Sequence, residues 1–103
     1  MNRPMDQSII LAKLREHREE LHAAGVEHLS LFGSYARGTA VQFASDVDLM
    51  AEFDPARKYS LLDRVRLENR LADLLGVQVD LASAAALRET VKERVVREAV
   101  LAF

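Results

Sequence analysis

Apolar and polar residues follow two different periods along this chain, and the two periods predict different elements. In three short stretches, 26–32, 47–53 and 76–81, apolar residues alternate with polar ones, which is typical of strands with one buried face. Elsewhere apolar residues recur every three or four positions, which predicts helices over 7–24, 61–75 and 83–103, the last with a break near residues 89–90 left open. The order of these elements predicts an α/β (α+β) protein.

Residues with known preferences for helix ends support these boundaries. Asp6 and Ser60 are suited to cap helix N-termini, and Gly25 and Gly76 are suited to end helices. We expect a short helical turn at 34–37 and a loop over 39–45. For the helix over 61–75 the expected apolar face consists of Leu61, Leu62, Val65, Leu71, Leu74 and Leu75.

The candidate chemistry is concentrated between residues 33 and 49. Residues 33–38 read Gly-Ser-Tyr-Ala-Arg-Gly, and residues 45–49 read Ser-Asp-Val-Asp-Leu. Because side chains alternate along a strand, Asp46 and Asp48 share one face while the apolar residues of 47–53 fill the other. Two neighbouring carboxylates repel each other, and a divalent cation resolves that conflict. The other interpretation of this pair is a solvated strand end.

A third carboxylate has the same relation to its apolar neighbours. In the stretch 76–81, Asp80 lies on the polar face, opposite Val77, Val79 and Leu81. If the two strands are neighbours, all three carboxylates project from one face of one sheet. Alternatively, Asp80 is an exposed acid at a sheet edge or caps the segment that follows.

The residues between the first two strands are suited to bind phosphate. Gly33 allows the backbone to turn sharply and approach a ligand closely. Ser34 can offer a hydroxyl and an amide to a phosphate, and Arg37 can add charge-assisted hydrogen bonds. The alternative is a turn that uses glycine and serine for its conformation, with Arg37 in solvent. For Tyr35 the sequence leaves open whether it packs over a nucleotide or covers the turn.

Composition limits the remaining possibilities. We expect a single domain over residues 1–103, since this length supports one hydrophobic core. Charged residues make up 29% of the chain but the net charge is only −2, so we expect no direct nucleic-acid binding. No apolar run is long enough to span a membrane, and no signal peptide pattern is present, so we expect no membrane association and a cytoplasmic location.

Taken in order, Gly33-Ser34, the Asp46/Asp48 pair and Asp80 resemble the nucleotidyltransferase superfamily that includes DNA polymerase β. In form they are most similar to the minimal nucleotidyltransferases, which are often paired with HEPN-type toxins. The resemblance covers roughly residues 9–103 and implies a nucleotidyltransferase fold, with a small mixed sheet of three core strands flanked by helices. It implies that Asp46 and Asp48 bind the Mg²⁺ on the nucleotide phosphates and that Asp80 completes a second metal site.

By the same resemblance, we expect a Mg²⁺-dependent protein adenylyltransferase. Its reaction moves AMP from ATP to a hydroxyl, expected to be a tyrosine, of a partner HEPN-type toxin, so that the chain acts as the antitoxin of a toxin–antitoxin pair. The sequence ends soon after the third carboxylate, so the acceptor is expected to be bound by this small domain itself, by a second copy, or by a partner chain that is also the substrate; the minimal nucleotidyltransferases fit the last case. Two alternatives stay open: a non-catalytic antitoxin that binds the toxin, and a homo-oligomeric transferase for a small hydroxylated molecule.

The C-terminal residues leave one further alternative open. Two apolar stripes are expected on the helix over 83–103, one made of Val95, Ala99 and Ala102 and the other of Val96, Val100 and Phe103. One stripe can face the core while the other meets a partner, or both can fold back onto the helix over 61–75. The charged residues between 88 and 98 are typical of a solvated helix face.

Overall fold

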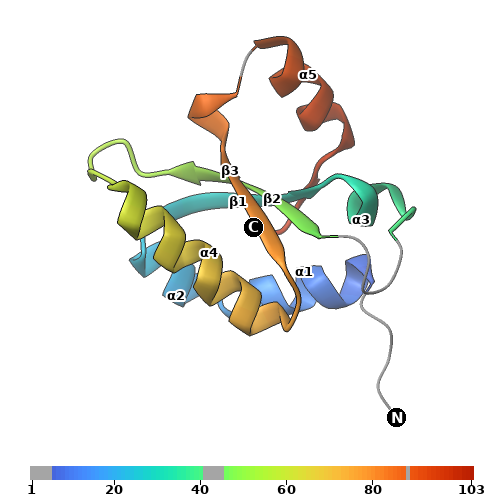
Figure 1. The fold of residues 1–103 in the computed structure, drawn as a ribbon, viewed down its shortest axis with the longest axis horizontal. Helices are drawn as coiled ribbons and strands as arrows, with labels where there is room; N and C mark the ends of the chain where they lie inside the picture. Colours follow the sequence, from blue (N-terminus) through green and yellow to red (C-terminus); the bar gives the residue numbers. More distant parts are fainter. Residues whose placement is uncertain (1–5, 41–45, 88) are drawn as a thin grey trace.

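The structure of the chain, a computed structural model, describes residues 6–40, 46–87 and 89–103. In this part of the chain one mixed sheet has the strand order β3-β2-β1-β4, with helices on its two faces (Figure 1). The strands are β1 (Val26–Phe32), β2 (Val47–Phe53), β3 (Val79–Ser83) and β4 (Val100–Leu101). The helices are α1 (Gln7–Glu16), α2 (Arg18–Ala23), α3 (Ser34–Arg37), α4 (Leu61–Leu75) and α5 (Glu89–Glu98), with a 3₁₀ turn at Ala84–Ala86.

The predicted fold class is confirmed. Strand β1 pairs antiparallel with β2, and β2 pairs parallel with β3 through the crossover helix α4. These are the three core strands that were expected, and β4 adds a fourth on the other side of β1. The third strand begins later than predicted, at Val79, because residues 76–78 serve as the turn that leaves α4. Of the predicted loop 39–45, residues 41–45 lie outside the described residues.

One face of the sheet packs against α1, α2 and α4 and forms the main hydrophobic core (Figure 1). The apolar face predicted for β2 is buried there, since Val47, Leu49 and Ala51 have no exposed surface. The first helix was predicted to be continuous over 7–24, but it ends at Glu16 and a second helix begins at Arg18. Within the described residues, no helix has the length and apolar character needed to cross a membrane.

Helix α4 begins as predicted, and Leu71 and Leu75 of the predicted apolar face are buried, but the predicted residues in its first turns are not. The Ser60 side chain accepts a hydrogen bond from the backbone N–H of Asp63, and the Asp63 carboxylate accepts one from the backbone N–H of Ser60. The buried residues are Leu67, Leu71 and Leu75, whereas Leu61, Leu62 and Val65 are 77%, 56% and 46% exposed.

The prediction that these three residues belong to the core face was therefore wrong. At about 100° per residue, Leu62 and Val65 lie on the side of the helix away from Leu67 and Leu71, and Leu61 lies in the exposed first turn, about 80° around the helix from Leu71. In the first turns, the position that faces the sheet is occupied by Arg64 instead, whose guanidinium donates a hydrogen bond to the Leu81 carbonyl at 3.3 Å.

The C-terminal segment also differs from its prediction. It was expected to be helical over 83–103, but the helix ends at Glu98 and the chain then adds β4 to the free edge of β1. The pairing continues beyond β4, because Ala102 donates a backbone hydrogen bond to Leu29 at 2.8 Å. Ala102 is buried in the main core. The segment thus pairs with β1 as a strand instead of continuing the helix, and Ala102 joins the core to which Leu67, Leu71 and Leu75 of α4 also belong.

Helix α5 lies on the other face of the sheet (Figure 1). It packs there through Val95, which forms a small second cluster with Met50 and Ala84. Met50 and Asp48 are two residues apart on β2, so they share this face. Helix α5 therefore lies on the same face of the sheet as the candidate carboxylates and contacts it at Val95, while Asp46 and Asp80 stay exposed.

Two leucines of α4 test this account of the core. We expect Leu71→Ala to lower the free energy of unfolding by about 2–5 kcal/mol, because it removes a fully buried side chain and leaves a cavity. Leu61→Ala is the matched control on the same helix, and it should change stability by no more than about 0.5 kcal/mol. Urea unfolding of the two variants gives the comparison, and similar losses in both would contradict the assigned face.

Candidate functional site

The register between β2 and β3 brings two of the predicted carboxylates together. Asp48 and Asp80 are direct partners across the parallel pair, and Asp46 comes just before β2 begins. Residues paired across adjacent strands have their side chains on the same face. Asp48 is half-buried, while Asp46 and Asp80 are exposed. The shared face that the sequence predicted is therefore present for Asp48 and Asp80.

The surroundings of Asp48 disfavour its charged form. Burial raises the pKa of this carboxyl above its usual range, and the neighbouring charges of Asp80 and Asp46 raise it further. The guanidinium of Arg37 acts in the opposite direction. Three carboxylates of the chain thus interact electrostatically, and Asp48 is at the centre of that interaction.

The donor set of this face fits a magnesium ion. Carboxylate oxygens are the ligands that Mg²⁺ prefers, and a divalent cation beside Asp48 would offset the repulsion that raises its pKa. Among the described residues, no three His, Cys, Asp or Glu side chains are already gathered as a metal-binding group. Asp46, Asp48 and Asp80 would therefore have to turn toward a common point to share an ion, and their role as metal ligands stays a prediction.

Gly33 is placed directly against Asp48. It has a φ of 75°, a conformation that residues with a side chain rarely adopt. A Cβ at this position would collide with the Asp48 carboxylate. The close approach of the turn to the carboxylate thus depends on glycine for two reasons, one conformational and one steric.

The residues after Gly33 form the short helical turn that the sequence predicted. Ser34 begins α3, and its carbonyl accepts a hydrogen bond from the backbone N–H of Thr39 at 2.9 Å. Arg37 ends α3, and its own backbone N–H donates to the Gly33 carbonyl at 3.1 Å. These bonds hold the turn beside the start of β2. Binding of phosphate by Gly33, Ser34 and Arg37 stays a prediction.

Sequence reasoning missed one residue that contacts this site. Glu98 was read as part of a solvated helix face, but its carboxylate forms an ion pair with Arg37, with 3.2 Å between Oε2 and Nη1. The two residues are 61 positions apart, and no local pattern signals such a contact. Arg37 is therefore not simply in solvent.

The structure decides between the two interpretations of Tyr35. Its ring is only 4% exposed and belongs to the main core, so it covers the turn and does not present a face to a nucleotide. Its hydroxyl is buried and has no hydrogen-bond partner in the part of the chain that the structure describes.

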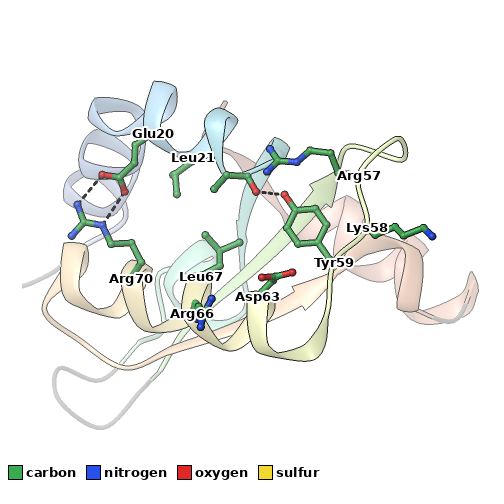
Figure 2. Close-up of a pocket in the computed structure, with 10 residues that line it drawn as sticks. Glu20, Leu21, Arg57, Lys58, Tyr59, Asp63, Arg66, Leu67 and Arg70 are labelled. Carbon is green, nitrogen blue, oxygen red and sulfur yellow. Dashed lines mark hydrogen bonds and ion pairs between the residues drawn. The ribbon is translucent and has the colours of Figure 1, made fainter.

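A separate pocket of about 290 Å³ lies between α2 and α4, next to the segment that follows β2 (Figure 2). Two of its basic residues are engaged locally: Arg70 pairs with Glu20 at 2.8 Å, and Arg57 donates to the Ala23 carbonyl at 2.7 Å. The Tyr59 hydroxyl donates to the Ala24 carbonyl, which holds the segment after β2 against α2. The contacts around this pocket hold α2, α4 and the segment after β2 together. The pocket lies at the opposite end of β2 from the carboxylates.

The raised pKa of Asp48 predicts a stability effect that depends on pH. Because the folded state disfavours the charged carboxyl, the unfolded state loses its proton first, and stability falls as pH rises above the usual value of 3.8. Asp48→Asn, which cannot ionise, should therefore raise the melting temperature at neutral pH without ligand. Glu52→Gln on the same strand is the control.

The advantage of the Asp48→Asn protein should shrink as the pH is lowered toward 3.8, because the carboxyl of the unmodified protein then becomes neutral as well. Melting curves at a series of pH values measure this. A lower melting temperature of the variant at neutral pH would contradict the account of Asp48.

The unpartnered hydroxyl of Tyr35 predicts that its removal stabilises the fold. Tyr35→Phe should raise the free energy of unfolding by about 1 kcal/mol, since a buried hydroxyl without a hydrogen bond is costly. Tyr59→Phe is the matched control and should lower it by about 1 kcal/mol, because it removes a hydrogen bond. Chemical denaturation measures both, and a clear loss of stability in Tyr35→Phe would show that the hydroxyl has a partner.

Comparison with known proteins identifies the family of the chain. The family model described as a nucleotidyltransferase domain matches residues 11–102. The protein adenylyltransferase MntA of Thermococcus cleftensis is 39% identical over 94 residues, which is 91% of this chain and 89% of that protein.

Solved structures agree with the sequence comparison. A structure described as a minimal nucleotidyltransferase is 40% identical, covers 93% of this chain and 95% of its own, and superposes with a TM-score of 0.75. The MNT antitoxin in complex with a tri-AMPylated HEPN toxin of Shewanella oneidensis has a TM-score of 0.66 over 91% of this chain and 71% of its own; at 20% identity this likeness concerns the fold alone. The chain belongs to the nucleotidyltransferase domain family, among the minimal nucleotidyltransferases, and is a nucleotidyltransferase enzyme.

Proposed function

We propose that the chain transfers AMP from ATP, in a Mg²⁺-dependent reaction, to a hydroxyl of a partner protein. The observation that carries the proposal is the pairing of Asp48 with Asp80 beside Gly33, in a chain 39% identical to a protein adenylyltransferase. We further propose that the acceptor is a tyrosine of a HEPN-type toxin and that the chain acts as its antitoxin. The AMPylated HEPN toxin in the related complex supports a HEPN-type toxin as the acceptor, while the tyrosine rests on the family resemblance.

Each residue of the site has a part in this proposal. Asp46, Asp48 and Asp80 would hold Mg²⁺, which when bound neutralises phosphate charge and polarises the α-phosphate. Gly33 lets the triphosphate approach the turn, while Ser34 and Arg37 would donate hydrogen bonds to its oxygens. With ATP as its donor, we assign the reaction to the cytoplasm.

The proposed transfer is an in-line displacement at the α-phosphorus of ATP. The acceptor hydroxyl oxygen forms a bond to the α-phosphorus as the bond from that phosphorus to the bridging oxygen breaks, and pyrophosphate leaves. Asp80 is exposed and lies next to Asp48, so a carboxylate oxygen of Asp80 can accept the proton of the incoming hydroxyl. An acceptor carried on another protein can reach this carboxylate from solvent.

The test is to incubate the protein with ATP, Mg²⁺ and the product of the neighbouring gene, and then to measure the intact mass of that partner. We expect the partner to gain the mass of one or more AMP groups. The gain should be lost when Mg²⁺ is removed by a chelator and in the Asp46→Asn/Asp48→Asn double variant. The control is Glu52→Gln, an exposed change on β2 that should leave the transfer intact.

Three results would change the proposal. Full transfer by the double Asn variant would exclude Asp46 and Asp48 as metal ligands. A stable complex with no change in mass would favour a non-catalytic antitoxin that binds its toxin. No complex with the partner, together with homo-oligomers that transfer AMP to a small molecule, would favour the transferase for small hydroxylated compounds.

A further inference from the structure

The backbone of Arg37 is held at the site by a hydrogen bond, but its long side chain is partly exposed and has many rotamers. Its backbone N–H is bonded to the Gly33 carbonyl, and its guanidinium is close enough to Asp48 to influence that carboxyl electrostatically. The side chain is nevertheless 49% exposed. An arginine with this much freedom must be ordered before it can bind a phosphate, and this ordering costs side-chain entropy.

One contact orders the guanidinium in the structure. Glu98 accepts a hydrogen bond from Arg37 Nη1 through Oε2, and its own side chain is 37% exposed. Ion pairs with such exposure contribute little to the stability of a fold. What this contact does is link the guanidinium of Arg37, at the end of α3, to the C-terminal end of α5.

Glu98 is itself held in place by the residues on both sides of it. Val95 packs against Met50 and Ala84 on that face of the sheet, and Ala99 donates a backbone hydrogen bond to the Val95 carbonyl at 2.7 Å. Two residues after Glu98, Val100 pairs with Leu31 of β1. The C-terminal end of α5 therefore descends beside α3 at a defined position (Figure 1).

From these contacts we infer that Glu98 is a positioning residue for nucleotide binding, acting through Arg37. The carboxylate contacts one nitrogen of the guanidinium, and the remaining N–H groups stay available for phosphate oxygens. Through this contact α5 takes part in binding the nucleotide. The inference rests on the proposed function, because it requires that Arg37 binds the triphosphate of ATP.

The test compares the affinity of Mg²⁺·ATP for four proteins by isothermal titration calorimetry: the unmodified chain, Glu98→Gln, Arg37→Ala and the double variant. We expect Glu98→Gln to weaken binding by about two- to fivefold, as loss of an exposed ion pair would. Its melting temperature without ligand should stay close to that of the unmodified chain. Glu93→Gln, an exposed change on the same helix, is the matched control and should bind normally.

The double variant shows whether Glu98 affects nucleotide binding through Arg37 or independently of it. If Glu98 acts through Arg37, Arg37→Ala should weaken binding more than Glu98→Gln does, and adding Glu98→Gln should cause no further loss. In the transfer reaction, Glu98→Gln should raise the KM for ATP and leave kcat nearly unchanged.

Two outcomes would overturn the inference on its own. One is unchanged or tighter binding of Mg²⁺·ATP by Glu98→Gln, which would mean that Glu98 competes with the nucleotide or has no influence. The other is a double variant in which the two losses simply add. If the unmodified chain fails to bind Mg²⁺·ATP, the proposed function is wrong and the inference falls with it.

Discussion

The parallel pairing of β2 with β3 is the constraint on which the site depends. It places the Asp48 and Asp80 carboxylates side by side, although like charges disfavour that arrangement. The opposite face of the same strands keeps the register: Val47, Leu49 and Leu81 are buried in the main core, and a shift of one residue would turn them to the other face. Burial of apolar side chains therefore maintains a charge arrangement that electrostatics alone would oppose, and Gly33 fits against that arrangement because it has no side chain.

Strand β3 carries one of these carboxylates at the edge of the sheet, where its outer backbone groups need partners. Two side chains of α4 supply them at Leu81: Glu68 accepts from the Leu81 N–H at 3.0 Å, and Arg64 donates to the Leu81 carbonyl. The crossover helix thus satisfies the outer backbone groups of the edge strand at Leu81, while Asp80 remains exposed to solvent.

The sequence predicted the elements whose signals are local. Alternation marked 26–32 and 47–53, and Ser60 marked the start of α4. It also placed Asp48 and Asp80 on polar faces, but their adjacency depends on a strand register that no single segment encodes. The exposed residues Leu61 and Val65 were misassigned because apolar character alone does not show which side of a helix meets the sheet. Strand β4 was read as helix because its hydrogen bonds are made with a distant strand, and the contact between Arg37 and Glu98 was missed for the same reason.

That unpredicted C-terminal strand connects the candidate site to the rest of the fold. With only two residues, β4 makes few hydrogen bonds to β1. Arg15 of α1 adds to them: its Nε donates to the Ala102 carbonyl at 2.7 Å, and its Nη2 donates to the Leu101 carbonyl at 3.1 Å. Hydrogen bonds from a charged group are stronger than those between neutral groups. Arg15 therefore helps to hold this two-residue strand against β1. Glu98 lies two residues before β4. By holding β4, Arg15 of α1 on one face of the sheet helps to position the Glu98 carboxylate beside Arg37 on the other face.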